Sequence, residues 1–137
     1  MKFHIQDRDL IEIISRKPFP KGTAVISIAD VGSEFAELWY DPDELLQLRF
    51  DDYEPINALT DEQAKEIAEF YHRVSKTVKR IVCQCEHNKA RSAAIVAAIK
   101  EYSEGNGIEI FADDRYFPDK VVFRKVLEAL KERELKC

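Results

Sequence analysis

The sequence lacks any long apolar segment. No stretch reaches the roughly 18 consecutive apolar residues that a membrane-spanning helix needs. The N-terminus shows no basic region followed by an apolar run, which is the pattern of a secretory signal. We therefore expect a cytoplasmic protein with no membrane partner.

Cysteine is also scarce. The chain has three cysteines, of which Cys83 and Cys85 are one residue apart and Cys137 is the last residue. This spacing differs from the disulfide framework of a small secreted domain. We expect the protein to work in a reducing compartment.

An excess of basic residues is missing as well. Lysine and arginine number 21 against 26 acidic residues, so the formal net charge is -5. Long nucleic acids and anionic membranes are bound by clustered lysine and arginine, so the charge argues against both partner classes. Phosphorylated proteins remain compatible, because they need only one local positive site.

Internal repeats and low-complexity linkers are absent from the sequence. The 137 residues are 45% apolar and 34% charged, which suits one globular domain with a hydrophobic core. We expect residues 1–137 to form this single domain, and the chain to be a monomer.

Apolar patterning predicts strands that alternate with helices along the chain. The expected strands are 2–5, 24–28, 45–50 and 80–85; the expected helices are 9–16, 61–78, 91–104 and one that begins near 117. Such alternation predicts an α/β fold with a central, mainly parallel sheet flanked by helices on both faces.

The sequence also predicts three local features. Thr60 and Gln63 have the spacing of a capping box at the start of the second helix. The apolar residues of helix 9–16 are expected on one face, carried by Leu10, Ile13 and Ile14. Trp39 and Tyr40 are expected to cover the core.

The segment from Cys85 to Ser92 is the most informative part of the chain. It reads Cys-Glu-His-Asn-Lys-Ala-Arg-Ser and lies between a predicted strand end and a predicted helix start. Backbone N–H groups converge on an anion at such a place. The same field favours a thiolate, since cysteines at helix N-termini beside arginine titrate at about 3.5 to 7.5 instead of about 8.5. Cys85 is therefore predicted to be a nucleophile at neutral pH.

This segment resembles the phosphate loop of the cysteine-dependent protein tyrosine and dual-specificity phosphatases. Their pattern is His-Cys-x-x-Gly-x-x-Arg-Ser/Thr, and the chain matches it at Cys85, Arg91 and Ser92. Gln84 replaces the histidine and Asn88 replaces the glycine. Asparagine is the non-glycine residue that best tolerates a positive φ, so we expect the loop to close at Asn88. In the family this histidine orients the loop and helps to keep the cysteine ionised, whereas glutamine can only hydrogen-bond. The pKa of Cys85 is therefore expected to be higher than in the family.

The resemblance extends loosely to the C-terminal part of the chain. The sequences Tyr116-Phe117-Pro118 and Val122-Phe123 look like the tail of the compact bacterial and phage branch of the family. The resemblance implies the same α/β architecture as the hydrophobic pattern. Residues 1–23 show no resemblance to this family.

The resemblance also implies a reaction without metal or cofactor. Cys85 attacks phosphorus and forms a phosphocysteine, which water then cleaves. Arg91 forks onto two phosphoryl oxygens, and Ser92 helps the thiolate leave in the second step. The remaining phosphate oxygens are expected to bind backbone N–H groups of Glu86, His87, Asn88, Lys89, Ala90 and Arg91.

The leaving oxygen needs a proton, which the family takes from an aspartate on a separate upstream loop. Asp52 lies 33 residues before Cys85, after the predicted strand 45–50, and is the expected general acid. Asp51 is the alternative acid and Glu54 the third choice. The other interpretation of this segment is a solvated acidic turn.

Alternatives remain open for the cysteines. Cys85 could be a buried structural cysteine followed by a charged turn. Cys83, Cys85 and His87 also form a Cys-x-Cys-x-His pattern, but no fourth metal ligand is close in sequence. Cys83 could instead capture an oxidised Cys85.

Two function classes follow from the sequence. The first is a phosphomonoester hydrolase of the protein tyrosine or dual-specificity type. Its substrate is a phosphorylated protein or a small phosphomonoester, with a phosphoinositide, a nucleotide or an RNA 5′ end also open. The second is a phosphate-binding module, a pseudophosphatase, that lost efficient catalysis through Gln84 and Asn88.

Overall fold

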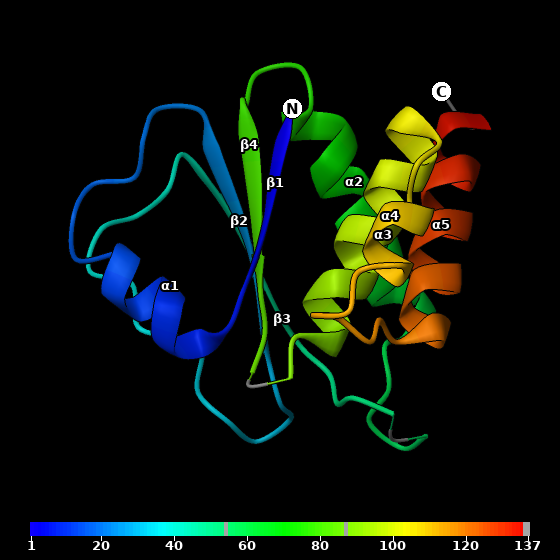
Figure 1. Cartoon of the computed structure of the whole chain (residues 1–137), viewed down its shortest axis with the longest axis horizontal. Coiled ribbons are helices and arrows are strands. Elements are labelled where there is room, and N and C mark those ends of the chain that lie inside the picture. The colour runs from blue at the N-terminus through cyan, green and yellow to red at the C-terminus, as the bar shows by residue number, and fades with distance from the viewer. Residues whose placement is uncertain (54, 87, 136–137) are drawn as a thin grey trace.

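A computed structural model of the chain describes residues 1–53, 55–86 and 88–135 (Figure 1). Strands and helices alternate through most of it, as the sequence predicts. In chain order they are β1 (Lys2–Gln6), α1 (Arg8–Ile14), β2 (Thr23–Ala29), β3 (Glu44–Arg49), α2 (Asp61–Val74), β4 (Arg80–Gln84), α3 (Ala90–Glu104), α4 (Ile108–Phe111) and α5 (Lys120–Leu135).

The described strands form one sheet in the order β1-β4-β2-β3, and every neighbouring pair is parallel. Helix α1 lies on one face, and α2, α3, α4 and α5 lie on the other (Figure 1). Strand β2 is buried at every position, because both of its edges are paired and both of its faces are covered. The prediction of an α/β fold with a parallel sheet and helices on both faces is confirmed.

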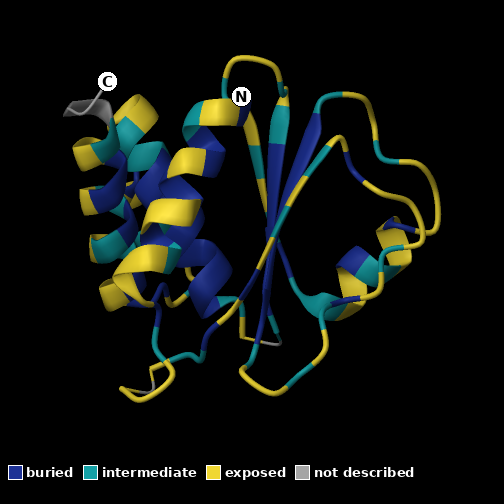
Figure 2. Cartoon of the chain, turned by 180° about the vertical axis from the view of Figure 1, so that it is seen from behind, coloured by how far each residue is buried: buried dark blue, intermediate teal, exposed yellow. Residues whose placement is uncertain are grey.

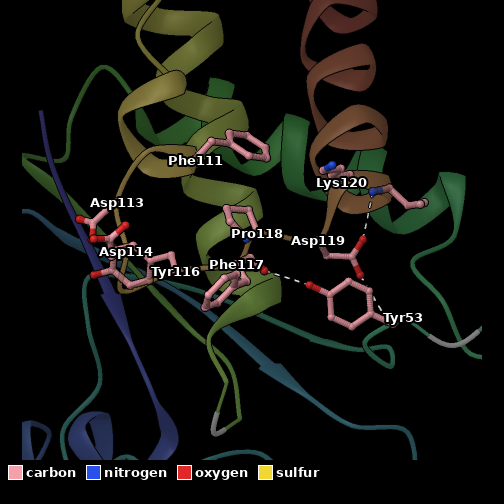
Figure 3. A pocket seen from close by; sticks show the side chains of 10 residues that line it. Tyr53, Phe111, Asp113, Asp114, Tyr116, Phe117, Pro118, Asp119 and Lys120 are labelled. Carbon is pink, nitrogen blue, oxygen red and sulfur yellow. Dashed lines mark hydrogen bonds between the residues drawn. The ribbon is translucent and has the colours of Figure 1, made fainter.

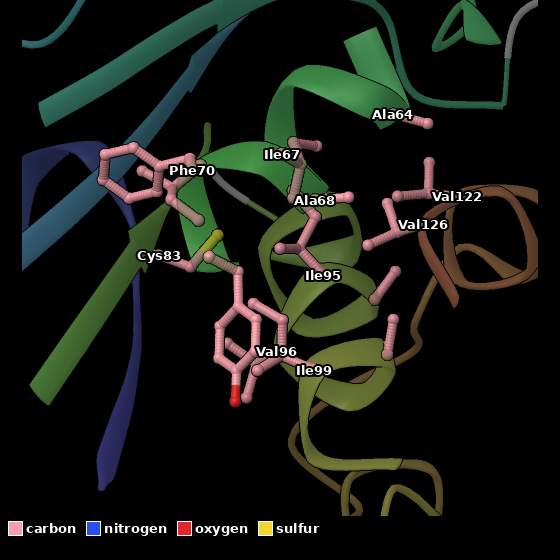
Figure 4. Packing of buried hydrophobic residues seen from close by; sticks show 14 of the residues in the cluster. Ala64, Ile67, Ala68, Phe70, Cys83, Ile95, Val96, Ile99, Val122 and Val126 are labelled. Carbon is pink, nitrogen blue, oxygen red and sulfur yellow. The ribbon is translucent and has the colours of Figure 1, made fainter. Parts of the chain in front are cut away.

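The main core lies between the sheet and helices α2, α3 and α5 (Figure 4). Its side chains include Ile67 and Phe70 from α2, Ile95 and Ile99 from α3, and Val126 from α5. Helix α3 is buried at every position from 90 to 99, since it is packed between the sheet and α5 (Figure 2). This explains why its sequence is apolar on all sides.

Helix α2 begins as the sequence predicts. The Thr60 hydroxyl accepts a hydrogen bond from the Gln63 N–H at 3.0 Å, and the Gln63 side chain accepts one from the Thr60 N–H at 3.0 Å. The helix ends at Val74, earlier than expected.

The predicted buried face of α1 is wrong. Leu10, Ile13 and Ile14 are all exposed, and Ile11 is the fully buried residue of this helix. Ile11 packs with Val25 in a small second core on the other face of the sheet. A helix of seven residues over a small core has room to bury few side chains, and here it buries one.

The prediction that Trp39 and Tyr40 cover the core is also wrong. Trp39 is 64% exposed and Tyr40 is 47% exposed. The Trp39 ring packs under the guanidinium of Arg16, at 5.3 Å, instead of against the core. The smaller side chains of Ala36 and Leu38 fill the second core in its place.

Two connections leave the same edge of the sheet, at the bottom of Figure 1. One joins β3 to α2 and the other joins β4 to α3. Because the strands are parallel, their carboxyl ends meet at this edge. None of the helices in the described ranges combines the length and the apolar character needed to cross a bilayer.

Candidate active site

The predicted phosphate loop lies where the sequence places it, between the end of β4 and the start of α3. Cys85 follows Gln84, the last residue of β4, and Lys89 precedes Ala90, the first residue of α3. His87 lies outside the described residues.

Gln84, which replaces the family histidine, is fully buried and holds the start of the loop. Its Oε1 accepts a hydrogen bond from the Ser27 hydroxyl at 2.6 Å, and its Nε2 donates to the Cys85 carbonyl at 2.9 Å. The Cys85 N–H donates to the Gln6 carbonyl at 3.3 Å. The backbone of Cys85 is therefore tied to β1 and, through Gln84, to β2.

The Cys85 thiol lies inside the main core rather than on the surface. Its Sγ is 3.2 Å from the Ser92 hydroxyl oxygen, and neither residue is exposed. Burial raises the pKa of the Cys85 thiol, while hydrogen bonds from Ser92 and the charge of Arg91 lower it by less. Desolvation therefore opposes the positive field on which the sequence expectation of a thiolate at neutral pH rests, and that expectation stays a prediction.

Arg91 is buried under the loop, with only 2% of the residue exposed. Its Nη1 donates to the Phe50 carbonyl at 2.6 Å and forms an ion pair with Asp30 Oδ1 at 2.8 Å. Its Nε is buried and has no hydrogen-bond partner among the described residues. A buried donor without a partner is costly, so this atom marks a place for an acceptor.

The two candidate acids have different surroundings. Asp52 Oδ2 accepts a hydrogen bond from Asn88 Nδ2 at 2.5 Å, which places Asp52 beside the loop. Asp51 Oδ1 accepts from the Val31 N–H at 2.9 Å. The structure thus brings Asp52 to the loop and connects Asp51 to the segment after β2. Glu54 lies outside the described residues.

Lys89 has a left-handed φ of 59°. The expected positive φ at Asn88 stays a prediction, because this angle also depends on His87, which lies outside the described residues. The Asn88 side chain stabilises the loop end, since its Oδ1 accepts the Ala90 N–H at 3.0 Å. Lys89 at the N-cap makes no side-chain capping bond, so Asn88 satisfies one free N–H at the start of α3 in its place. The Ala90 N–H is one of the groups that the sequence assigns to phosphate.

A pocket of about 670 Å³ opens beside the loop. Arg91 lines it, together with four carboxylate side chains. The lining residues are Asp30, Val31, Ser33, Asp51, Asp52, Tyr53, Glu86, Asn88 and Arg91.

Three residues outside the sequence predictions also shape the site. Arg8 Nη1 donates to Glu86 Oε1 at 2.8 Å, which fixes the loop to α1. Asp30 pairs with Arg91. Asp119 Oδ2 accepts the Tyr53 N–H at 3.3 Å, and the Tyr53 hydroxyl donates to the Phe117 carbonyl at 2.9 Å (Figure 3).

A sequence signal existed for one of these residues. Asp30 directly follows β2, so the rule that parallel strands end at one edge would have found it. Arg8 and Asp119 lie far from the motif in sequence, and only the tertiary fold brings them close.

The metal interpretation depends on His87, which the structure does not describe. Within the described ranges, no three His, Cys, Asp or Glu residues are grouped to hold a metal ion. Cys83 and Cys85 are free, buried thiols. Burial raises the pKa of Cys83 well above its ordinary value, so it is a poor source of thiolate.

Comparison with known proteins gives a match in structure alone. No family model and no curated protein matches the sequence. The crystal structure of Tk-PTP in its active form matches with a TM-score of 0.57 and 21% identity, covering 96% of this chain and 90% of Tk-PTP. The fold is that of a protein tyrosine phosphatase.

A human protein also shares this fold. It is the tyrosine phosphatase-like serine/threonine/tyrosine-interacting protein, with a TM-score of 0.52 and 20% identity. The match covers 83% of this chain and 77% of the human one. The same fold therefore occurs in Tk-PTP and in a tyrosine phosphatase-like interacting protein.

Proposed function

We propose that the chain is a cysteine-dependent phosphomonoester hydrolase of the protein tyrosine or dual-specificity type. The observation that carries the proposal is the buried Arg91, whose Nε lacks a partner among the described residues and whose side chain lines the pocket. An arginine held there suits a phosphoryl group, because its planar fork matches two phosphate oxygens. The phosphatase fold supports the same proposal.

The proposed reaction has two displacement steps. The Cys85 thiolate attacks phosphorus, the ester P–O bond breaks, and Asp52 gives its proton to the leaving oxygen. Water then attacks the phosphocysteine, the S–P bond breaks, and the Asp52 carboxylate takes a proton from that water. Ser92, which lies 3.2 Å from Sγ, stabilises the departing thiolate.

Phosphate would be held mainly by Arg91 and by the loop backbone. The N–H groups proposed for this role belong to residues 86 to 91, including His87, as the sequence indicates. Phosphate would compete with Asn88 for the Ala90 N–H and with Asp30 for Arg91. Binding therefore exchanges internal hydrogen bonds for bonds to phosphate.

The charge of the pocket favours substrates that carry a single phosphate. Its lining includes Asp30, Asp51, Asp52 and Glu86, and Arg91 is the only cationic side chain among the described lining residues. Further phosphate groups would face these carboxylates at short range, where like charges repel. Phosphorylated protein side chains and small phosphomonoesters fit better than nucleotides, phosphoinositides or RNA 5′ ends. We propose a cytoplasmic monomer without a cofactor.

One observation favours the second candidate, a phosphate-binding module. Cys85 is fully buried and its thiol pKa is raised, so the nucleophile is weak in this arrangement. A module would keep Arg91 and the loop for binding and would not need a reactive thiolate.

Turnover of p-nitrophenyl phosphate between about pH 5 and pH 8 tests the proposal. The wild type is compared with Cys85→Ser, Asp52→Asn and Asp51→Asn, with EDTA and vanadate as controls. We expect activity that EDTA leaves intact and vanadate inhibits, lost in Cys85→Ser and reduced in Asp52→Asn more than in Asp51→Asn. Folded wild type without turnover, but with binding of a phosphotyrosine peptide, would establish the module instead.

A further inference from the structure

Asn88 connects the candidate acid to the phosphate loop through one side chain. Its Nδ2 donates to Asp52 Oδ2 at 2.5 Å, and its Oδ1 accepts the Ala90 N–H at 3.0 Å. Asp52 and Asn88 are 36 residues apart in sequence and come from different connections of the sheet. A glycine at this position, as the phosphatase pattern has, could make neither bond.

The two oxygens of Asp52 are unlike each other. Oδ2 is fixed by Asn88, whereas Oδ1 is buried and has no hydrogen-bond partner among the described residues. Asp52 lines the pocket that Arg91 also lines. A buried carboxyl oxygen without a partner is unfavourable when ionised, so Oδ1 is the better site for a proton.

Asp119 also fixes this segment, through the residue after Asp52. It is buried, and its Oδ1 accepts the N–H groups of Val121 at 3.0 Å and Val122 at 3.2 Å, which caps α5. Its Oδ2 accepts the N–H of Tyr53, the residue after Asp52 (Figure 3). Tyr53 has a φ of 58°, a strained value for tyrosine, so its backbone is held by its surroundings.

The charged groups around Asp52 act in both directions. Burial, the largest cause, raises the pKa of the Asp52 carboxyl; the Asn88 hydrogen bond and the Arg91 charge lower it, and the Asp119 carboxylate raises it. Arg91 is itself paired with Asp30. The net direction is upward, which keeps the carboxyl protonated to a higher pH than an ordinary aspartate.

We propose that Asn88 and Asp119 are positioning residues for Asp52, with Asn88 binding Oδ2 so that Oδ1 carries the proton to the leaving oxygen. When the Oδ1–H bond breaks and the proton moves to the leaving group, Asp52 becomes a carboxylate. The hydrogen bond from Asn88 strengthens as this charge develops. Asp119 holds the backbone of the acid segment against α5. The inference rests on the proposed hydrolase function.

Three variants test it in the full chain. Asn88→Gly removes the amide and restores the family residue. Asp119→Asn keeps one capping oxygen for α5 but removes the charge. Asp114→Asn is the matched control, because Asp114 is exposed and outside the contacts of Asp52.

The first readout is the pKa of Asp52, measured by carboxyl ¹³C NMR titration, which does not depend on turnover. Asn88→Gly should raise it, since a donor to the carboxylate is lost. Asp119→Asn should lower it, since a neighbouring negative charge is lost. Asp114→Asn should leave it unchanged. Equal pKa values in the wild type and Asn88→Gly would overturn the inference.

The second readout is kinetic. Asn88→Gly should lower kcat about 10- to 100-fold with little change in KM, because the bond acts on the transition state. In an Asp52→Asn background the same change should have little further effect, because Asn88 acts through Asp52. Additive losses would show a merely structural role.

The two proposals can fail separately. Turnover by the wild type, together with an unchanged kcat in Asn88→Gly, would remove this inference and leave the hydrolase. Absence of turnover would remove the hydrolase and, with it, the catalytic role of Asn88. In that case the titration would still decide whether Asn88 and Asp119 act on Asp52.

Discussion

Arg91 Nη1 lies 2.8 Å from Asp30 Oδ1, so the guanidinium that should bind phosphate already holds a carboxylate. The two partners differ in exposure, since the Arg91 side chain is 2% exposed and that of Asp30 is 47% exposed. Because the Asp30 carboxylate is partly exposed, solvent screens its charge and weakens the ion pair. Asp30 is therefore the partner that an entering phosphate can displace.

Removing this competitor should strengthen anion binding. Asp30→Asn should bind phosphate or vanadate about fivefold more tightly, the size of one net hydrogen bond. It should also lower thermal stability, because Arg91 loses a partner for its buried charge. Calorimetric titration with phosphate measures the first effect, with Asp114→Asn as the control. Unchanged affinity in Asp30→Asn would show that Asp30 does not compete.

The order of the main elements was predictable from local patterns. Strand β2 is an unbroken apolar run, and the start of α2 has a capping box. Each of these signals spans only a few neighbouring residues, so no tertiary information is needed to find it. The prediction of the buried face of α1 failed because the helix has more apolar residues than the small second core can bury.

The site was predictable only in part. Residues Cys85 to Ser92 lie together in sequence, so the loop could be found from its motif. The burial of Cys85 in the main core could not be found, because it depends on tertiary packing, and the arginine field alone suggested the opposite direction for the pKa of the thiol. The pairs of Asp30 with Arg91 and Asn88 with Asp52 join residues from different connections, which no local pattern reveals.

Replacing Arg91 by lysine should keep the positive charge but lose the planar guanidinium that can bind two phosphate oxygens. We expect Arg91→Lys to lower kcat about 10²- to 10³-fold, as for the removal of one transition-state donor. The exposed Arg115 pairs with Asp113, so Arg115→Lys is a matched control that should keep its activity. Steady-state kinetics with circular dichroism separates lost chemistry from lost folding. Near-normal kcat in folded Arg91→Lys would contradict bidentate binding.

Ser92→Ala should slow the second chemical step more than the first. The hydroxyl lies next to Sγ and also donates to the Lys89 carbonyl at 3.2 Å, so its loss removes stabilisation of the departing thiolate. Rapid mixing with p-nitrophenyl phosphate should show a burst of product followed by slow turnover. Ser103→Ala, in the last turn of the same helix, serves as the control. Slow turnover without a burst would place the defect in the first step.

The ionisation of Cys85 gives a pH prediction with a definite sign. Because burial raises the pKa of this thiol, the neutral form should persist through neutral pH, and the thiolate should appear only above the ordinary thiol value of about 8.5. Thiolate absorbance in the ultraviolet, taken as the difference between wild type and Cys85→Ser, measures this without requiring access to the thiol.

The raised pKa of Cys85 also predicts how kcat/KM depends on pH. The proposed reaction needs Cys85 ionised and Asp52 protonated, and burial raises the pKa of both groups. The pH at which kcat/KM is highest should therefore lie above the pH that ordinary pKa values of the two groups would give. A thiolate signal complete below pH 7 would instead mean that the loop field outweighs burial in solution, and the expectation drawn from the motif would then be the correct one.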